Sequence, residues 1–370
     1  MGILVFLSFN IYFLSPVARA IEEFSLSDLY YRVAWQDDVE PPQSPNITLV
    51  DITPLYDRGE IADVLEEVGK CEPAVIGVDV IFEGEKEDVA ADMRIMEVAA
   101  DMPATVFANK LIDYSSADGS FHNVVRPFFA NDRTIEGYVN AVGDMSSTCL
   151  RYLSVERKLE GKPVESFTAK IAEAYREQAL PQGQRADRFI NYRFMDFPVV
   201  NYDSIAQNVD LLKDRIVLLG SITEEQDMHY TPLGKMPGLK VQGYAIQTLL
   251  DQRNVITVSD EWMWLITIIV GYITALWQFY WLRFVARGKT PFGIFLANSK
   301  ILLRLLTFAW LALLVWLSYL SYERLEIYVP MAVIITSVIL VSEARGLYIA
   351  LVKYIHAASH GKFCAKSIYL

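Results

Sequence analysis

The segment AVIGVDVIF, residues 74–82, is an almost continuous apolar run that a single charged residue, Asp79, interrupts. A strand that is apolar on both sides is typical of a parallel sheet whose two faces are covered by helices. The run therefore predicts a buried central strand. It also places Asp79 near the carboxyl end of that strand.

Similar strand-like segments alternate with helical patterns on both sides of this run, between residues 46 and 252. The helical segments carry apolar residues at helical spacing. This alternation predicts an α/β domain with a mostly parallel central sheet. The other predicted strands are Asn46–Ile52, Pro103–Lys110, Gly137–Val142, Arg188–Tyr192 and Arg215–Ser221, and the predicted helices are Gly59–Cys71, Ser166–Gln178 and Val241–Gln252.

Three long apolar segments follow the α/β region, within residues 259–350. The first, residues 262–282, carries no charge over about the ~20 residues that cross a bilayer, and tryptophans lie near both of its ends. The others are residues 301–320 and 327–349. Three such segments predict a C-terminal region of three transmembrane helices and make the lipid bilayer a partner. Buried helices of a soluble protein are the alternative.

The charges of the chain are unevenly distributed. Residues 262–370 carry ten Lys/Arg and three Asp/Glu, whereas residues 1–261 carry 23 Lys/Arg and 42 Asp/Glu. The acidic block argues against nucleic acid as a partner. The basic residues gather in the 283–300 loop and the tail, residues 351–370, which the positive-inside rule places in the cytoplasm. The domain at residues 21–258 is then expected outside.

The N-terminal hydrophobic segment, residues 1–20, leaves two interpretations open. It is apolar but short, has no basic flank and ends in ARA, residues 18–20. One interpretation is a cleaved signal peptide, and the other is an uncleaved transmembrane helix whose start is missing. We favour the uncleaved helix, and either one would export the domain that follows.

Two cysteines of the exported domain, Cys71 and Cys149, could form a disulfide in an oxidising compartment. The favoured alternative is two free thiols.

A set of short motifs gives the chain a family resemblance. It resembles CHASE2 sensor proteins, bacterial membrane receptors with an extracytoplasmic CHASE2 domain followed by three transmembrane helices. The match covers roughly residues 24–252, and the helices extend it to about residue 350. The matching pieces, in family order, are VDI (50–52), VIGVDVIF (75–82), FINYR (189–193), LKDRIVLLGS (212–221), D-x-H-x-TPLG (227–234) and MPGLKVQGYAIQTLL (236–250).

The resemblance implies a multi-pass protein of the bacterial cytoplasmic (inner) membrane that detects a small-molecule or protein signal and works as a homodimer or as a subunit of a membrane complex. Because the sequence shows no catalytic constellation, we expect that the protein is not an enzyme. Two departures from the family are visible. Gln242 stands where the family leads us to expect a histidine. About 20 residues follow the last helix, where family members usually continue into an output domain such as a kinase, cyclase or phosphatase. A separate output protein is therefore predicted.

Polar residues near the carboxyl ends of the predicted strands are the candidate ligand-binding residues. Open α/β sheets bind ligands at this edge. The alternative is that Asp51 and Asp79 cap the following helices or pair with arginines inside the fold. The candidates expected to line one crevice are Asp51, Asp79, Asn140, Asn191, Tyr192, Asp227 and His229.

The segment EEQDMHYTPLGKMPG, residues 224–238, places Asp227 and His229 two residues apart. A metal site would need further ligands, and Ser221 lacks the G-x-S-x-G context of a nucleophile. We therefore predict no metal, no cofactor and no catalytic residue. The favoured role of this pair is to fix a loop, with ligand contact second. At the level of the whole protein, the alternative to a sensor is a structural subunit of a cell-envelope complex.

Overall fold

The computed structural model describes residue 31 and residues 39–102, 104–140, 149–251, 256–287, 300–325 and 327–358. These residues form two compact units, the α/β unit within residues 31–251 and the helical unit within residues 256–358. The predicted N-terminal hydrophobic segment, residues 1–20, and the end of the predicted tail, residues 359–370, lie outside the described residues.

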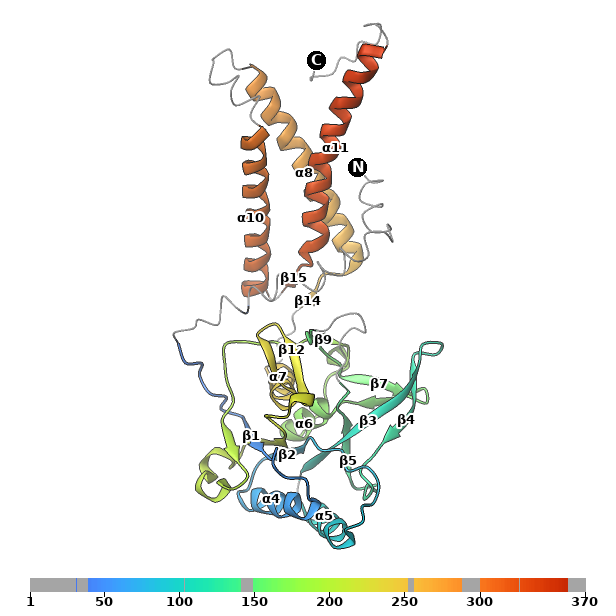
Figure 1. The fold of residues 1–370 in the computed structure, drawn as a ribbon, viewed down its shortest axis with the longest axis vertical. Helices are drawn as coiled ribbons and strands as arrows, with labels where there is room; N and C mark the ends of the chain where they lie inside the picture. The colour runs from blue at the N-terminus through green and yellow to red at the C-terminus, as the bar shows by residue number, and fades with distance from the viewer. Residues whose placement is uncertain are drawn as a thin grey trace. The chain divides into compact units, whose positions relative to one another are not determined.

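Nine of the described strands in the α/β unit form one sheet, shown in Figure 1. Its parallel part consists of β1 (Ile47–Asp51), β2 (Val75–Val78), β3 (Thr105–Ser115), β5 (Ile135–Tyr138), β10 (Val199–Asn201) and β11 (Ile216–Gly220). These strands lie in the order β10-β1-β11-β2-β3-β5, and each adjacent pair is parallel. The predicted α/β class with a mostly parallel sheet is confirmed.

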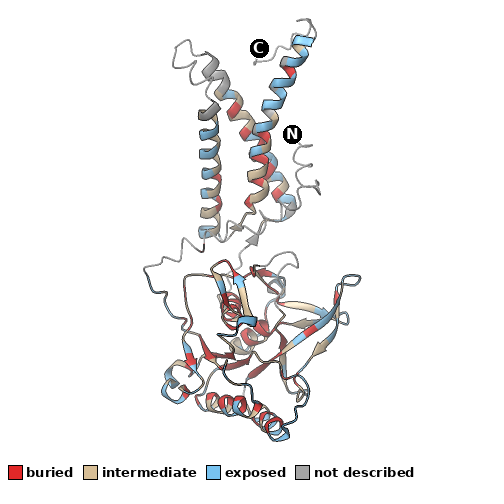
Figure 2. Ribbon diagram, viewed as in Figure 1, coloured by how far each residue is buried: buried red, intermediate tan, exposed pale blue. Residues whose placement is uncertain are grey.

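The strands at the centre of this sheet are buried along their whole length. Every residue of β2 and of β11 is buried, and Figure 2 shows buried residues gathered in the strands. Since side chains of successive strand residues point to opposite faces, both faces must be covered. This is why the two segments read as apolar runs without alternation.

Four helices cover the two faces of the parallel sheet: α4 (Arg58–Lys70) and α5 (Val89–Asp101) on one, and α6 (Phe167–Arg176) and α7 (Gly238–Leu250) on the other. Under α4 and α5, apolar side chains of the helices, such as Leu65 and Ile95, pack with Ile76 and Val78 of β2 in one buried cluster. On the other face, a Cβ added at Gly77 would lie 2.5 Å from Ile171 Cδ1 of α6.

Side chains just before the helices fix where three of them begin. The Asp57 carboxylate accepts hydrogen bonds from the backbone N–H groups of Gly59 and Glu60 at the start of α4. Asp88 caps α5 in the same way, and the Ser166 hydroxyl caps α6. These bonds satisfy backbone donors that the first turn of a helix leaves without intrahelical partners.

Gly137 of β5 permits the start of α6 to approach the sheet closely. A Cβ added at Gly137 would lie 2.5 Å from both the backbone nitrogen and the Cα of Phe167. Backbone atoms cannot move aside as a flexible side chain can, so this contact requires glycine. It holds the first turn of α6 against the carboxyl end of β5.

The sheet forks at Asn109 because the long strand β3 has different partners along its length. Residues 106–109 of β3 pair with β5, whereas residues 110–115 pair antiparallel with β4 (Ser120–Val125). The sheet continues from β4 to β7 (Glu156–Leu159) and β8 (Lys162–Glu165). One branch of the fork is therefore β5, and the other is the β4-β7-β8 extension.

Three predicted segments of the α/β unit differ in the structure. The strand predicted at Gly137–Val142 is β5, whose bounds are Ile135–Tyr138. Residues 188–192 were expected to form a strand of the central sheet, but only β9 (Arg188–Phe189) is extended, and it pairs antiparallel with β6 (Tyr152–Leu153) outside that sheet. Residues 224–238, expected as a loop, form a 3-10 turn (Glu225–Asp227) and a hairpin of β12 (Met228–Thr231) and β13 (Gly234–Pro237). Further short 3-10 turns are Gln182–Gln184, Ile205–Gln207 and Val209–Leu211.

Cys71 is a buried free thiol, so the possible Cys71–Cys149 disulfide is not formed. Its Sγ lies 3.5 Å from the backbone oxygen of Glu67. Burial raises the pKa of the Cys71 thiol, with a further contribution from the negative charge of Glu67.

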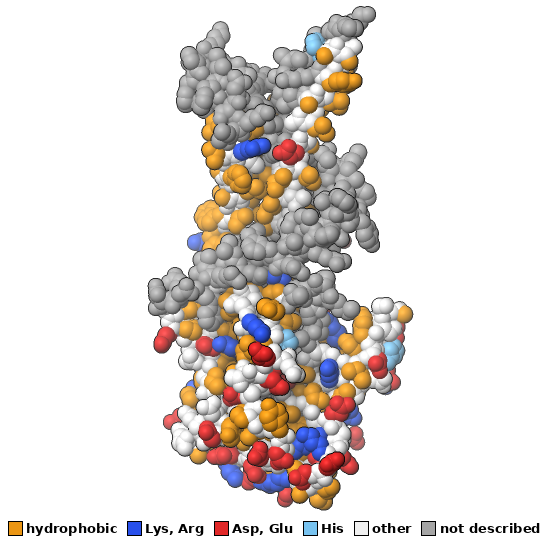
Figure 3. All heavy atoms as spheres, in the orientation of Figure 1, with side chains coloured by type: hydrophobic (Ala, Val, Ile, Leu, Met, Phe, Trp, Pro, Cys, Tyr) orange, Lys and Arg blue, Asp and Glu red, His pale blue; other side chains and the backbone are white. Residues whose placement is uncertain are grey.

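The helical unit contains three helices, α8 (Asp260–Arg287), α10 (Lys300–Leu325) and α11 (Met331–Ala358). Each holds a candidate membrane span: Glu261–Trp281, Leu302–Leu325 and Met331–Ala358. Hydrophobic side chains dominate the described surface of these helices, whereas charged side chains are frequent on the α/β unit (Figure 3). The three predicted apolar segments are therefore long helices of a composition that suits a bilayer.

The third helix begins at Met331 rather than near residue 327, because Pro330 directly precedes it and residues 327–328 are extended. Residues 327–328 form β15 (Ile327–Tyr328), which pairs in parallel with β14 (Ile256–Thr257), just before α8. Apolar side chains from all three helices, including Met263, Leu314 and Ile334, form a common core. The segments that precede α8 and α11 are thereby joined by backbone hydrogen bonds.

Candidate functional site

A small cavity of about 120 Å³ lies at the carboxyl ends of β2 and β5. Its walls come from these strand ends, from β12, from β6 and its neighbours, from Ile190, and from the first turn of α6 and the first two turns of α7. The position is where an open α/β sheet is expected to bind ligands. The lining residues are Asp79, Tyr138, Val139, Asn140, Leu150, Tyr152, Leu153, Ser154, Ser166, Thr168, Ile190, Asp227, His229, Gly238, Val241, Gln242 and Ala245.

Asp79 is held at the rim of the sheet by the last hydrogen bond of the β2–β11 ladder, which its backbone N–H donates to Leu219 O at 2.8 Å. The residue as a whole retains some exposure, but its carboxyl group is enclosed by protein. Burial and, to a smaller extent, the negative charge of Asp227 raise the pKa of Asp79 to about 7, although His229 opposes the shift. Asp79 is thus poised to change charge near neutral pH.

Asp227 and His229 reach the same cavity from the turn that opens the β12–β13 hairpin. The distance from His229 Nε2 to Asp227 Oδ1 is 3.6 Å, and both side chains are partly exposed. The Asp227 carboxylate lies against Gly238, the first residue of α7, where an added Cβ would be 2.7 Å from Asp227 Oδ1. A carboxylate at a helix N-terminus is favoured by the helix dipole, so Asp227 joins the hairpin electrostatically to α7.

Four of the seven candidates predicted from the sequence line this cavity: Asp79, Asn140, Asp227 and His229. Asn140 lies in its wall, but its side-chain amide pairs with the backbone of Leu111, donating to Leu111 O and accepting from Leu111 N, each at 2.7 Å. This pairing extends the hydrogen bonding of β3 past the end of β5. Asn140 therefore has a structural role that its ligand prediction did not include.

The remaining three candidates do not line the cavity, so the prediction of one crevice for all seven is wrong. The Asp51 carboxylate accepts hydrogen bonds from the backbone and hydroxyl of Thr53 and folds back on its own turn. Asn191 donates its backbone N–H to Thr248 Oγ1. Tyr192 is fully buried, and its hydroxyl donates to Leu150 O at 2.8 Å. Its ring belongs to the apolar interior, packed 5.3 Å from that of Tyr244.

Among the described residues, the alternative roles considered for Asp51 and Asp79 are also not observed. Asp57 and Asp88 cap the helices that follow these strands. The buried arginine of this region, Arg58, pairs with Asp92 at 2.5 Å. Neither strand-end aspartate is thus needed to complete a helix cap or this ion pair.

Several residues of the cavity had no signal in the sequence beyond their position near a strand or helix end. Ser166 and Thr168 belong to the start of α6, and Ser154 binds the Tyr138 hydroxyl at 2.9 Å. Gln242 lines the cavity at the position where the family resemblance suggested histidine. Only that motif comparison would have directed attention to Gln242.

The chemistry of the cavity is that of charge and hydrogen bonding. Within the described residues there is no group of three or more His, Cys, Asp or Glu side chains arranged to hold a metal ion. Ser221 lies in the turn after β11, where its hydroxyl is 3.2 Å from Thr53 Oγ1 and accepts from Glu224 N. These contacts organise the turn that leads toward Asp227.

The α/β domain, with its polar cavity at the strand ends, is thus followed in the sequence by three helices of a length and composition that suit a membrane. Residues 3–277 match the family model of the CHASE2 domain, so the chain belongs to the CHASE2 family, a family of sensory extracellular domains. No curated protein and no solved structure matches the chain.

Proposed function

We propose that this protein is a membrane-bound sensor of the bacterial cytoplasmic membrane. The CHASE2 domain lies on the outer side and detects a chemical signal, and the C-terminus lies in the cytoplasm. The membrane helices pass the signal to a separate output protein. Family membership and the three candidate spans support a sensory domain attached to a membrane. The basic 283–300 loop supports the orientation.

The observation that carries the proposal is the position of α7 in both space and sequence. Its first two turns line the small cavity that contains Asp79 and Asp227, called the acidic cavity below, through Gly238, Val241, Gln242 and Ala245. Its last residue is Leu250, and α8, which holds the first candidate span, begins at Asp260. A rigid helix thus begins at the candidate site and ends shortly before the chain reaches the helical unit.

Hydrogen bonds from outside the helix anchor the far end of α7. Arg176 of α6 donates to the backbone oxygens of Leu249 and Leu250, which the end of a helix leaves without intrahelical partners. Thr248 binds the backbone of Tyr244 within α7 and that of Asn191 outside it. A change of charge at Asp79 therefore acts on a helix that is anchored at both ends. The signal biases the equilibrium between two positions of that helix.

The test compares cross-linking in the helical unit of Asp79→Asn and unchanged chains in native membranes. Cysteines replace Ile256 and Ile327, which are paired in the β14–β15 ladder, and the rate of disulfide formation is measured. We expect Asp79→Asn, which mimics the protonated carboxyl group, to change this rate. Arg94→Gln, on the exposed side of α5, is the matched control and should not. Equal rates in all three chains would rule out transmission from the cavity.

A structural subunit of an envelope complex remains the competing function. Purification from native membranes in mild detergent distinguishes the two. A sensor is expected as a homodimer with a partner that is recovered in variable amount. A permanent assembly of fixed stoichiometry, unaffected by Asp79→Asn, would instead establish scaffolding.

A further inference from the structure

A second and larger cavity, of about 560 Å³, lies where the sheet forks beyond Asn109. One wall is β5, with Glu136 and Tyr138, and the other is the β4-β7-β8 extension. Its volume is within the range of small-molecule sites, which is about 300–1,000 Å³. The lining residues are Asn109, Leu111, Val124, Arg126, Glu136, Tyr138, Glu156, Leu159, Pro163, Val164, Glu165, Lys170 and Arg185.

This cavity, called the fork cavity below, is lined by equal numbers of positively and negatively charged side chains. Three cations, Arg126, Lys170 and Arg185, face three carboxylates, Glu136, Glu156 and Glu165. An ion of one sign would add an uncompensated charge to such a site. A molecule that carries both signs brings a partner for each kind of wall residue.

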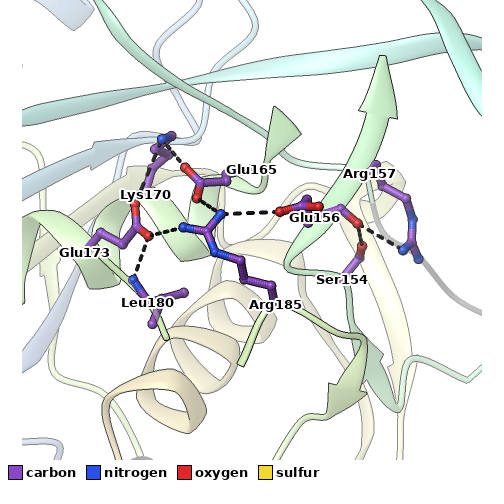
Figure 4. Close-up of polar contacts among 8 residues, drawn as sticks. All are labelled: Ser154, Glu156, Arg157, Glu165, Lys170, Glu173, Leu180 and Arg185. Atoms are coloured by element: carbon purple, nitrogen blue, oxygen red, sulfur yellow. Dashed lines mark hydrogen bonds and ion pairs between the residues drawn. The ribbon is translucent and has the colours of Figure 1, made fainter. Parts of the chain in front are cut away.

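Figure 4 shows how one end of the cavity is built around Arg185. Arg185 Nη1 donates to Glu165 Oε1 at 2.5 Å and to Glu156 Oε2 at 3.3 Å, and Nη2 lies 3.5 Å from Glu173 Oε1. Lys170 pairs with the second oxygen of Glu165. Burial opposes ionisation of Glu165, but the bonds from Lys170 and Arg185 outweigh it and lower its pKa. This end is therefore a network of ion pairs in which each charged group has a partner of opposite sign.

The other end of the cavity keeps free hydrogen-bonding capacity. Arg126 engages Glu136 through Nε and Nη2, which leaves the N–H groups of Nη1 without a described acceptor. The Arg126 side chain is 51% exposed, whereas that of Glu136 is only 9% exposed. Asn109 Oδ1 is buried and has no hydrogen-bond partner among the described residues. The free edge of the Arg126 guanidinium, just after β4, and the unpaired Asn109 Oδ1, on β3, therefore lie near the largely buried carboxylate of Glu136 on β5.

The remaining wall is apolar, from Leu111, Val124, Leu159 and Val164. We propose that the fork cavity binds a free α-amino acid with an apolar side chain. Arg126 takes its carboxylate, Glu136 and Asn109 Oδ1 take its ammonium group, and the apolar wall takes its side chain. This proposal deepens the proposed sensory function by naming a class of signal.

Tyr138 connects the fork cavity with the acidic cavity, because it lines both. Its hydroxyl is hydrogen-bonded to Ser154 at 2.9 Å, and both residues are buried. A ligand that reorders the end of β5 thus acts on the wall that also faces Asp79 and α7.

The test is calorimetric titration of the whole chain in detergent with L-leucine, N-acetyl-L-leucine and L-leucinamide. We expect L-leucine to bind, and each derivative, which lacks one of the two charges, to bind at least about tenfold more weakly, as for loss of a charge-assisted hydrogen bond. Arg126→Gln and Glu136→Gln should each weaken L-leucine binding by a similar factor. Arg94→Gln, which disturbs the exposed pair with Asp63 and Glu66, should leave it within about twofold.

Three outcomes would overturn the proposal: no heat from L-leucine or from any other apolar amino acid at millimolar concentration, equal binding of L-leucinamide and L-leucine, or binding of a neutral polyol in place of the amino acids. Circular dichroism of each variant shows that it is folded. The cross-linking test of the sensor uses no ligand, so a failure here leaves that result intact.

Discussion

Asp79 and Asp92 are carboxylates of the same α/β unit with opposite surroundings. Asp92 lies between α4 and α5, where Arg58 Nη1 is 2.5 Å from Oδ1 and Lys86 N donates to Oδ2 at 2.7 Å. Burial opposes its ionisation, but these hydrogen bonds outweigh burial and lower the pKa of Asp92. Asp79 is enclosed beside another acid, and its pKa rises to about 7.

The difference separates a charge that stabilises the fold from a charge that can respond to the surroundings. The Arg58 guanidinium also donates to Glu83 O and stacks 4.6 Å from the ring of Phe128, so each side of the pair is satisfied. Such a site keeps one charge state at every physiological pH. Asp79 has no cation in direct contact among the described residues. Its charge therefore depends on pH and on what occupies the cavity.

The largest change in melting temperature is expected when the Arg58–Asp92 ion pair is broken. Arg58→Met leaves the Asp92 carboxylate, with a side chain 6% exposed, buried without its cation. We expect the melting temperature of the whole chain in detergent to fall by roughly 10 °C. The control Arg94→Gln removes a more exposed pair and should change it by less than about 2 °C. Equal effects of the two variants would show that burial does not distinguish these pairs.

The second largest effect is expected at Asp79, where the substitution should raise the melting temperature instead of lowering it. Its pKa is higher in the folded than in the unfolded chain, so the folded state retains a proton that the unfolded state loses as pH rises. Wild-type stability should therefore fall between about pH 4 and pH 7. Asp79→Asn should remove this slope and raise the melting temperature at pH 8 by roughly 5 °C. A slope that survives in Asp79→Asn would assign it to another group.

His229→Gln sharpens the comparison by removing the imidazole that opposes the rise in the pKa of Asp79. The pKa of Asp79 should rise, because His229 lowers it in the native chain. The midpoint of the stability slope should move to higher pH by less than about one unit. Thermal unfolding at a series of pH values measures it. A midpoint at lower pH would contradict the arrangement of charges described for the cavity.

Gly238→Ala is expected to have the smallest effect. The new Cβ would lie 2.7 Å from Asp227 Oδ1, so the partly exposed carboxylate must turn away from α7. With Asp227 further off, the pKa of Asp79 should fall, and the slope should move slightly to lower pH. The same pH series checks this, with Gly183→Ala as a control, since no atom lies within 4 Å of its added Cβ.

Much of the α/β fold was predictable because its signals are local. The runs at residues 47–51, 75–78 and 216–220 are apolar on both faces, and each forms a parallel strand. Helix α5 was missed because its residues, VAADMRIMEVAAD, carry a weaker amphipathic pattern with Met93 and Met96 exposed. Of the two branches of the fork, the β4-β7-β8 extension was missed, because β7 (ERKL) and β8 (KPVE) are short and partly polar.

The candidate site was predictable in part for a similar reason. Asp79, Asp227 and His229 were found because a strand end and a motif marked them. Asp51 and Tyr192 carry equally good local signals, yet one turns back on Thr53 and the other is buried. Whether a polar residue faces a cavity depends on the side chains packed around it, and these come from distant parts of the chain.

By itself, the sequence determined the class of the protein: an α/β domain with parallel strands, three helices long enough to cross a bilayer, and membership of the CHASE2 family. These properties follow from the spacing of apolar residues and from short motifs, which are local. Only the tertiary structure decided which charges meet. Arg58 reaches Asp92 across 34 residues, and Asp227 reaches the N-terminus of α7 and the surroundings of Asp79. Protonation depends on distances of a few ångströms between such groups, and only packing sets those distances.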